Sequence, residues 1–558
     1  MTPYSSLKRS FAATLTIGLI VGALYLVYRN GADSNPALAE DKKAARQDWI
    51  MYGGSTLRNM ANTAVKGLPT EWDVGDPKKK VKSVNIKWVA ELGSKAYGGP
   101  IIADGRVFVG TNNMNPRDKK WAFIDKMGKP VDLGVIMCFD EATGKFNWQS
   151  IHQKLPGGQV IDWPYEGICS SPHVEGDRMY YVSNRCEVVC VDVKAGAQIW
   201  TYDMIDKQKV FPHNISDCSP LLVDGHLWVV TSNGVNEQHL DVPQPGAPSF
   251  IKLKAGKDQK DMDKNDVVVW KENWPTKKLL QLPKGANAAN FFKELVNRGQ
   301  LIQHGQWANI AYDKASGQVI LPGGDGWIYS VDLNGNLIWK FDCNPRDAKY
   351  ALRTGERSDF ISTPVIYKNR VYIGTGQDPE HGTGIGHFWC IDMGKGMNGE
   401  DVSPDLVTDD TVFPPKTKKN PKSAAVWHYG GEITDAKLRK KLQRNYYFGR
   451  TMSTAAIHED LVYISDLNGI LRCMDANSGE VNWEFDTEGE TWSSPYYVDG
   501  KVYFGNDSKT LFVFEHGKKL NKLAENEMGA RIRATPSAAN GVLYVMTESK
   551  LYAIATKK

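Results

Sequence analysis

The stretch from Ser453 to Trp483, STAAIHEDLVYISDLNGILRCMDANSGEVNW, decides the fold. Three short apolar runs, at 455–457, 461–464 and 471–474, are separated by turns that contain Asp or Gly, and a fourth run ends in Trp483. Short apolar runs bounded by such turns are typical of β-strands joined as hairpins. The stretch therefore predicts one four-stranded antiparallel unit.

The same pattern recurs along the chain, and each copy opens with small or hydroxyl residues, usually before a Pro. Neighbouring copies lie as little as about 40 residues apart, which is what a four-stranded propeller blade needs. Blade 4 is the weakest match because it lacks the Pro. The eight openings are Gly98-Gly99-Pro100, Ser170-Ser171-Pro172, Ser219-Pro220, Trp307-Ala308-Asn309, Ser362-Thr363-Pro364, Ser453-Thr454-Ala455, Ser493-Ser494-Pro495 and Thr535-Pro536-Ser537.

The last copy ends one strand short, at Leu551 to Ile554, while an unassigned strand, Ile86 to Ala90, precedes the first. Pairing of the two would close the ring and remove its exposed edges. We therefore predict an all-β, eight-bladed β-propeller over 86–558, with insertions near 235–300 and 393–448 and a linker and entry segment at 41–85.

The first forty residues are predicted to be a signal or anchor segment. Lys8 and Arg9 precede an uncharged apolar run, 11–28, which as a helix is just long enough to cross a bilayer. Positive charge before such a run predicts export of the rest of the chain to the periplasmic side. Ala37-Leu38-Ala39 matches a cleavage pattern, so an uncleaved anchor and release by cleavage after Ala39 both stay open.

Composition agrees with a protein of many short β-strands and gives no sign of nucleic-acid binding. The chain has 558 residues, 17 Trp, 52 Gly and a formal net charge of +4. Aromatic residues and glycines suit many short strands joined by tight turns. Because no stripe of Lys and Arg interleaves with aromatic residues, no nucleic-acid partner is expected.

Trp residues recur at one repeat position, after a glycine turn, where packing between neighbouring blades is the simplest role. These structural tryptophans are Trp148, Trp200, Trp339 and Trp483. The run Asp140-Glu141-Ala142-Thr143-Gly144-Lys145-Phe146-Asn147-Trp148 resembles the Asp-x-x-Thr-Gly-x-x-x-Trp motif of the pyrroloquinoline-quinone-like propeller superfamily. The entry stretch Trp49 to Gly54, followed by Arg58-Asn59, is similar to how such proteins begin. Inserts with His304-Gly305-Gln306-Trp307 and Phe448-Gly449-Arg450-Thr451 resemble envelope propellers of planctomycete-type bacteria.

The resemblance implies two functional branches, quinoprotein alcohol dehydrogenases and non-catalytic scaffolds such as BamB. The dehydrogenases carry adjacent cysteines and an Asp, Glu and Asn set around Ca²⁺, and no matching motif occurs here. Cys-x-x-Cys-His, His-x-x-x-His and Cys-x-x-Cys patterns are also missing from the sequence. We expect no catalytic residues, no metal and no cofactor, with pyrroloquinoline quinone and calcium only under the dehydrogenase alternative.

The eight cysteines fall into groups. Four share one repeat position, before an apolar-Asp pair, and are predicted to be small buried fillers: Cys138, Cys190, Cys390 and Cys473. Cys343 stands alone. Cys169, Cys186 and Cys218 are expected on one face of the disc, where a disulfide within the trio and free buried thiols are alternatives.

Residues just before each innermost strand should crowd the mouth of the central channel and form a ligand or peptide site, or else a water-filled, salt-bridged mouth. They are Tyr97, Glu166, Asp217, His304, Gln306, Asp359, Arg450, Trp492, Arg531 and Arg533. We expect a binding or scaffold propeller whose partners are other envelope proteins, with the membrane as a further partner if the N-terminal helix is retained. The alternatives are a quinone-dependent dehydrogenase for a small alcohol or sugar, and a hydrolase or lyase that uses Asp217, His304 and Asp359, for which no motif is found.

Overall fold

The computed structural model describes residues 46–76, 78–157, 160–302, 304–351 and 354–556. Within these ranges no helix is long and apolar enough to cross a membrane. The predicted apolar helix 11–28 and the Ala39 cleavage point lie outside the described residues.

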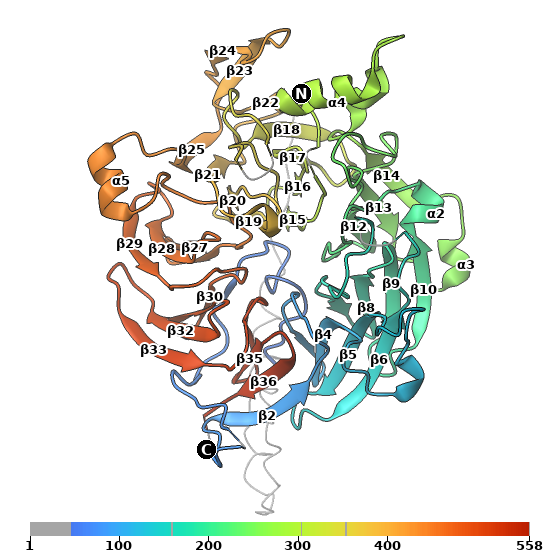
Figure 1. Ribbon diagram of the computed structural model, residues 1–558, viewed down its shortest axis with the longest axis vertical. Helices are drawn as coiled ribbons and strands as arrows, with labels where there is room; N and C mark the ends of the chain where they lie inside the picture. Colours follow the sequence, from blue (N-terminus) through green and yellow to red (C-terminus); the bar gives the residue numbers. More distant parts are fainter. Residues whose placement is uncertain (1–45, 77, 158–159, 303, 352–353, 557–558) are drawn as a thin grey trace, which may run out of the picture. The chain divides into compact units, whose positions relative to one another are not determined.

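Eight four-stranded antiparallel blades form a ring (Figure 1), and two of them carry a short fifth strand in parallel, β22 (Glu400–Asp401) on blade 4 and β1 (Ala61–Asn62) on blade 7. Strands are given from the centre outward. Blade 1 consists of β3 (Ile101–Ala103), β4 (Arg106–Asn112), β5 (Gly134–Asp140) and β6 (Phe146–His152), and blade 2 of β7 (His173–Glu175), β8 (Arg178–Val182), β9 (Glu187–Asp192) and β10 (Gln198–Asp203). Blade 3 consists of β11 (Leu221–Val223), β12 (His226–Val230), β13 (Phe250–Lys254) and β14 (Val268–Glu272), and blade 4 of β15 (Ala311–Asp313), β16 (Gln318–Pro322), β17 (Trp327–Val331) and β18 (Leu337–Asp342).

Blades 5 to 8 complete the ring. Their strands are β19 (Val365–Tyr367), β20 (Arg370–Gly374), β21 (His387–Asp392) and β25 (Ala425–Gly430); β26 (Ala456–His458), β27 (Leu461–Ser465), β28 (Ile470–Asp475) and β29 (Val481–Asp486); β30 (Tyr496–Val498), β31 (Lys501–Gly505), β32 (Thr510–Glu515) and β33 (Lys522–Glu527); and β34 (Ser537–Ala539), β35 (Val542–Met546), β36 (Lys550–Ile554) and β2 (Ile86–Glu91). The prediction of eight blades is confirmed. Strand β2 pairs antiparallel with β36, from Ile86 opposite Ile554 to Glu91 opposite Lys550, so the N-terminal strand closes the last blade.

The remaining elements decorate this ring. They are the strands β1 (Ala61–Asn62), β22 (Glu400–Asp401), β23 (Asp405–Asp409) and β24 (Lys416–Lys419), and the helices η1 (Lys119–Trp121), α2 (Met204–Gln208), α3 (Gln259–Met262), η3 (Lys277–Gln281), α4 (Ala288–Asn297), η4 (Pro379–His381) and α5 (Ala436–Leu442). The range 235–300 holds the outer strands β13 and β14 of blade 3 as well as added helices. The range 393–448 likewise holds β25, the outer strand of blade 5.

The Asp-x-x-Thr-Gly-x-x-x-Trp motif joins neighbouring blades. Asp140 accepts hydrogen bonds from the backbone N–H and the hydroxyl of Thr143, which sets the turn. Gly196, in the equivalent turn of blade 2, has φ +67, and a Cβ there would lie 2.4 Å from the Trp148 ring. The Trp148 indole also donates to the Val193 carbonyl at 3.2 Å. Trp148 therefore covers the turn of the next blade and excludes a side chain at Gly196, and Trp88, Trp270 and Trp427 do the same at Gly144, Gly335 and Gly479.

The shared cysteine position has a simple geometric origin. Cys138, Cys190, Cys390 and Cys473 lie directly opposite Trp148, Trp200, Trp427 and Trp483 on the neighbouring strand of their blades. All four thiols are buried and free. A small side chain beneath each indole leaves room for the ring, which explains why the position repeats.

A belt of hydrogen bonds links the openings of the blades around the central channel. The backbone N–H of Ser171 donates to the hydroxyl of Ser219 at 2.9 Å, and the N–H of Ser219 donates to the Asn309 amide oxygen at 2.6 Å. The belt continues through Thr363, Thr454, Ser494 and Thr535. The repeated Ser and Thr are therefore inter-blade acceptors, and in blade 4 Asn309 takes this role.

The entry segment, residues 47–62, crosses the centre of the ring and bonds to every blade (Figure 1). Its partners in blades 1 to 8 are, in order, Ile102, Val174, Ser219, Tyr312, Ile366, Ala455, Tyr497 and Ala538. Arg58 is fully buried and donates to the carbonyls of Tyr52, Ser219 and Ile310. The segment thus closes one end of the central channel.

Candidate functional site

The channel contains two adjoining chambers. The inner chamber, of about 100 Å³, has Tyr52 of the entry segment in its lining together with the hydroxyls of the inter-blade belt. The outer chamber, which we call the mouth pocket, has a volume of about 120 Å³ and shares lining residues such as Tyr97, Asp217 and Trp492 with the inner one. Because the entry segment closes the far end, the mouth pocket is the way into the channel.

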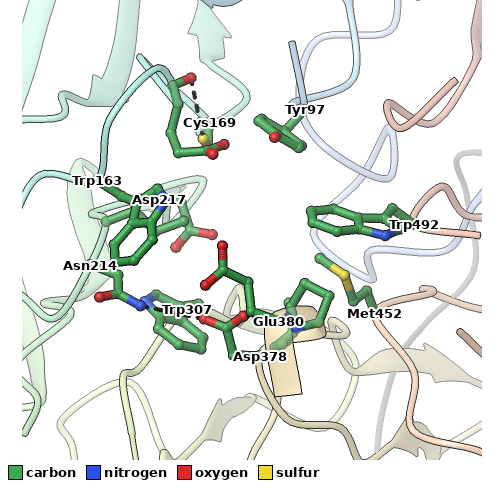
Figure 2. Close-up of a pocket in the computed structure, with 14 residues that line it drawn as sticks. Tyr97, Trp163, Cys169, Asn214, Asp217, Trp307, Asp378, Glu380, Met452 and Trp492 are labelled. Carbon is green, nitrogen blue, oxygen red and sulfur yellow. Dashed lines mark hydrogen bonds between the residues drawn. The ribbon is translucent and has the colours of Figure 1, made fainter. Parts of the chain in front are cut away.

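The mouth pocket combines aromatic walls with carboxylates (Figure 2). The aromatic residues are Tyr97, Trp163, Trp307 and Trp492, and the acidic ones are Glu166, Asp217, Asp378 and Glu380. In Figure 2 the carboxylates of Asp217 and Glu380 point toward the centre of the pocket. Tyr97 and Trp492 stack with ring centroids 5.8 Å apart, which fixes one wall.

Burial sets the protonation of two of these acids. The pKa of Asp217 is raised well above its usual range by burial, and its Oδ1 has no hydrogen-bond partner among the described residues. Burial also raises the pKa of Asp378 to about 6, and the charges of Glu380 and Glu166 add to the shift. The pocket therefore gains negative charge as the pH rises through the weakly acid range.

Two cations lie at the edge, and each already has an acidic partner. Lys95 pairs with Glu166 at 2.7 Å. Arg533 pairs with Asp507 at 2.7 Å, and its guanidinium lies 3.8 Å from the centroid of the Trp492 ring. Among the described residues, Asp217, Asp378 and Glu380 form no ion pair with Lys or Arg, so the centre of the pocket is acidic.

The ten predicted mouth residues divide into three groups. Tyr97, Glu166, Asp217 and Trp492 line the mouth pocket, and Arg533 lines the inner chamber. His304, Gln306, Asp359 and Arg450 are buried in the walls, and Arg531 is exposed. The division follows the backbone, because a residue one position from a channel-facing one directs its side chain into a blade instead.

Among the lining residues that the sequence did not predict are Trp163, Asn214, Trp307, Asp378, Glu380 and Met452. Asp378 and Glu380 lie in the loop between β20 and β21, rather than before an innermost strand. In a propeller, the loop between the second and third strands lies at the same end of the blade as the segment that precedes the innermost strand. A search of both loop sets would therefore have found them.

The disulfide considered among Cys169, Cys186 and Cys218 is not formed in the structure, where all three are free thiols. The reason is that each has its own surroundings. The Cys169 thiol faces the Glu166 carbonyl, and the Cys186 thiol donates to the Thr231 carbonyl at 3.3 Å. Cys218 accepts from the backbone N–H of Val230 at 3.4 Å.

The pocket does not fit the quinone and calcium of the dehydrogenase branch. Pyrroloquinoline quinone is itself a tricarboxylate and would face an acidic pocket. Among the described residues, no three of the pocket's carboxylates bring ligand oxygens within 4.8 Å of one another, whereas Ca²⁺ needs six to eight converging oxygens. The arrangement suits a diffuse organic cation better than a coordinated metal ion.

The ring and its channel define an eight-bladed β-propeller with a central pocket. A family model described as outer membrane protein assembly factor BamB matches residues 132–243 and 420–558. These two matched stretches support the predicted resemblance to the pyrroloquinoline-quinone-like, BamB-like propeller superfamily.

Solved structures with the same fold share little sequence with the chain. A europium-containing methanol dehydrogenase is 12% identical, with a TM-score of 0.56, over 91% of this chain and 98% of that one. Quinohemoprotein alcohol dehydrogenase from Comamonas testosteroni is 12% identical, with a TM-score of 0.57, over 92% and 81% of the two chains. BamB from Moraxella catarrhalis is 12% identical with a TM-score of 0.47, over 85% and 97%. No curated protein matches the chain significantly. At these identities the likeness shows the fold alone.

Proposed function

We propose that the protein is a non-catalytic binding propeller of the cell envelope, whose mouth pocket holds a positively charged organic group. The ligand is a primary ammonium or a guanidinium, carried either by a small amine or by a Lys or Arg side chain of an envelope protein. The observation that carries the proposal is the pair of carboxylates of Asp378 and Glu380 inside aromatic walls, beside Asp217, whose buried carboxyl keeps its proton.

Both parts of this lining favour a cation. Carboxylates in a partly buried site attract positive charge more strongly than they do in water. The faces of Trp and Tyr rings attract cations by a further ~0.5–2 kcal/mol, according to desolvation. The volume of about 120 Å³ suits a cationic head group with a few carbons and is below the size typical of drug-like ligands.

The envelope location rests on the N-terminal sequence, where Lys8 and Arg9 precede the apolar run 11–28. Sequencing of the mature N-terminus tests it. A start at Glu40 supports release by cleavage, and an intact N-terminus in the membrane fraction supports an anchor. An intact N-terminus in the cytosolic fraction contradicts the proposal.

The alternative is a quinone-dependent dehydrogenase, which the fold shared with the two dehydrogenases favours. Its test is addition of pyrroloquinoline quinone and Ca²⁺ to the purified full chain. Stoichiometric quinone binding with dye-linked oxidation of an alcohol would replace the binding proposal with this one.

Titration calorimetry of the purified full chain with N-acetyl-lysine amide, N-acetyl-arginine amide and ethylamine tests the cation proposal, with acetate as the anion control. We expect binding of the cations and none of acetate. Asp378→Asn should weaken binding about tenfold, equivalent to ~1.4 kcal/mol. The matched control is Asp266→Asn, which removes an exposed carboxylate on the outer side of blade 3 and should leave affinity unchanged.

The pH dependence follows from the Asp378 pKa of about 6 in the free protein. Below that pH the carboxyl is protonated and uncharged, so affinity for a cation falls, and it rises as pH increases through 6. Asp378→Asn should flatten this dependence. Equal affinity at pH 5 and pH 8 in the parent chain would contradict the assignment.

A further inference from the structure

Beside the mouth pocket, four histidines from separate loops come together. His213 precedes β11, His239 lies between β12 and β13, His304 precedes β15, and His381 ends η4. The ring centroids of His213 and His304 are 4.2 Å apart, those of His239 and His304 are 4.6 Å apart, and those of His304 and His381 are 4.9 Å apart. These are four of the chain's 11 His, a concentration that packing alone does not require.

Three of the four offer ligand atoms that nearly converge. One ring nitrogen each from His213, His239 and His304 lies within 4.8 Å of the others, and Nε2 of His213 is 3.1 Å from Nε2 of His304. Two nitrogens bound to one tetrahedral Zn²⁺ at ~2.0–2.1 Å lie about 3.3 Å apart. The first pair is therefore already at the spacing that a shared metal ion needs.

Backbone carbonyls fix the orientation of two rings. Nδ1 of His213 donates to the Val235 carbonyl at 2.7 Å, and Nδ1 of His239 donates to the Glu237 carbonyl at 3.0 Å. A carbonyl cannot donate, so both protons reside on Nδ1 and both Nε2 atoms present lone pairs. This is the outer-shell arrangement that holds metal-ligating histidines in proteins.

An unpartnered ring nitrogen also points to a bound group. Nε2 of His239, the nitrogen that its Nδ1 bond leaves with a lone pair, is buried and has no hydrogen-bond partner among the described residues. Buried polar atoms in native proteins are nearly always satisfied, so this atom calls for a metal ion or a water.

The histidines are also in the state that metals bind. Burial lowers the pKa of His213 to about 3 and lowers the pKa values of His239 and His304, with repulsion among the rings as a further cause at His213 and His304. At neutral pH the imidazoles are therefore uncharged. Neutral imidazole is a preferred ligand of Zn²⁺ and of other late divalent transition metals.

We propose that His213, His239 and His304 form a binding site for Zn²⁺, with His381 or water as the fourth ligand. The rings of His239 and His304 are nearly parallel, at 12°, so their lone pairs do not yet point to one centre. Binding requires rotation of the His239 ring, which gives up its bond to the Glu237 carbonyl, so only His213 is held ready by its carbonyl partner. His239 is half-buried and lies in the loop between β12 and β13.

The site adjoins the mouth pocket through one shared residue. Trp307 lines the mouth pocket, its indole donates to the His213 carbonyl at 3.2 Å, and its ring centroid lies 4.9 Å from that of His304. The zinc proposal does not rest on the cation proposal, because the histidines are its only protein ligands. Failure of either leaves the other standing.

The test uses the purified full chain, stripped with a chelator and titrated with Zn²⁺ and Co²⁺, with Mg²⁺ as the negative control. We expect one high-affinity Zn²⁺ per chain, visible absorption bands from four-coordinate Co²⁺, and an increase in melting temperature on Zn²⁺ addition. Replacement of a ligand should weaken binding at least tenfold, which we predict for both His304→Gln and His239→Gln. The half-buried position of His239 keeps the test valid if His304→Gln fails to fold.

His458→Gln is the matched control. His458, His516 and the exposed Glu459 form the other group of metal-type side chains within 4.8 Å in the described chain. Unchanged Zn²⁺ affinity in His458→Gln, with loss in His239→Gln, supports the proposed site. Absence of high-affinity binding in the parent, or loss in His458→Gln alone, would overturn it.

Discussion

At the scale of single residues, two buried aspartates show how surroundings decide the role of one side chain. Asp359 is 1% exposed, and neither carboxyl oxygen has a hydrogen-bond partner among the described residues. Asp342 is 2% exposed, but its Oδ2 accepts from Arg346 at 2.9 Å and from Arg357 at 2.7 Å. Burial raises the pKa of Asp359 well above its usual range. Asp359 is therefore an uncharged acid, whereas Asp342 anchors two guanidinium groups.

Asp359→Asn should stabilise the protein at neutral pH. Above pH ~4 an aspartate in the unfolded chain is ionised while Asp359 in the folded chain keeps its proton, so folding becomes less favourable as pH rises. The amide cannot ionise and removes this penalty, so the variant should melt at a higher temperature than the parent at pH 7. Melting temperatures of the parent chain and Asp359→Asn at pH 4 and pH 7 test this, and the difference between the two proteins should vanish near pH 4.

Asp342→Asn provides the contrast at a site of equal burial. It leaves Arg357, itself 1% exposed, without its counter-ion and should destabilise by ~3–5 kcal/mol. If both substitutions lower the melting temperature at pH 7 by similar amounts, the assignment of an uncharged Asp359 is wrong.

The same residues show why the site was only partly predictable from sequence. Position before an innermost strand directs attention to Asp359 and Arg450 as much as to Asp217 and Trp492. The direction of each side chain depends on local backbone angles, which a repeat pattern does not contain. Asp378 and Glu380 lie in a loop whose path depends on contacts with other blades, so no spacing in the sequence connects them to Asp217.

At the scale of elements, the turn that receives a tryptophan is the device that docks one blade on the next. Gly196 has φ +67 and lies under Trp148, whereas Gly176 has φ +60, lies in the turn between β7 and β8, and has nothing within 4 Å of the position of a Cβ. Both glycines occupy the left-handed region. Only Gly196 also meets a side chain of the neighbouring blade.

Gly196→Ala should therefore destabilise more than Gly176→Ala. Both share the conformational cost of an alanine at positive φ, ~1–2 kcal/mol. Gly196→Ala adds a clash with the Trp148 ring, ~1–3 kcal/mol by analogy with overpacked cores. Denaturant midpoints of the two variants give the comparison. Equal midpoints would show that packing of the Trp148 indole does not require a glycine at position 196.

The positions of strands that follow short turns could be predicted from the sequence, whereas the positions of strands that follow long insertions could not. The pattern at 453–483 places β26 to β29 because each strand pairs with its sequence neighbour. Strands β14 and β25 pair only after long segments, at 255–267 and 393–424, that carry structure of their own. Their pairing is decided by contacts with residues distant in the sequence. The predicted insertions at 235–300 and 393–448 therefore include strands that belong to blades 3 and 5.

At the scale of the whole molecule, the N-terminal part of the described chain contributes twice. Residues 47–62 bond to all eight blades, and β2 supplies the last strand of blade 8. The closure was predictable because the repeat count left one strand over. The crossing by residues 47–62 was not, because most of its bonds are backbone bonds that any sequence can make, and nothing in the sequence connects the side chains of Arg58 and Asn62 to blades 3 and 8.

A chain that begins at residue 47 should fold as the full chain does, and a chain that begins at residue 93 should not. The second lacks the entry segment and leaves the edge of β36 unpaired, and exposed edges promote association between chains. Light scattering after size exclusion and far-UV circular dichroism compare the two. Addition of a peptide of residues 47–92 should restore a monomeric form. A monomeric chain from residue 93 with an unchanged melting temperature would contradict the assigned roles.

The entry segment has a consequence for traffic through the molecule. Because the entry segment closes one end of the channel, a ligand cannot pass through the ring and must enter and leave its chambers by the mouth pocket. Arrival and departure must then cross the same barrier, at the ring of Tyr97, Trp307 and Trp492. A partner protein bound over this entrance would slow the dissociation of a ligand from the chambers without contacting the ligand.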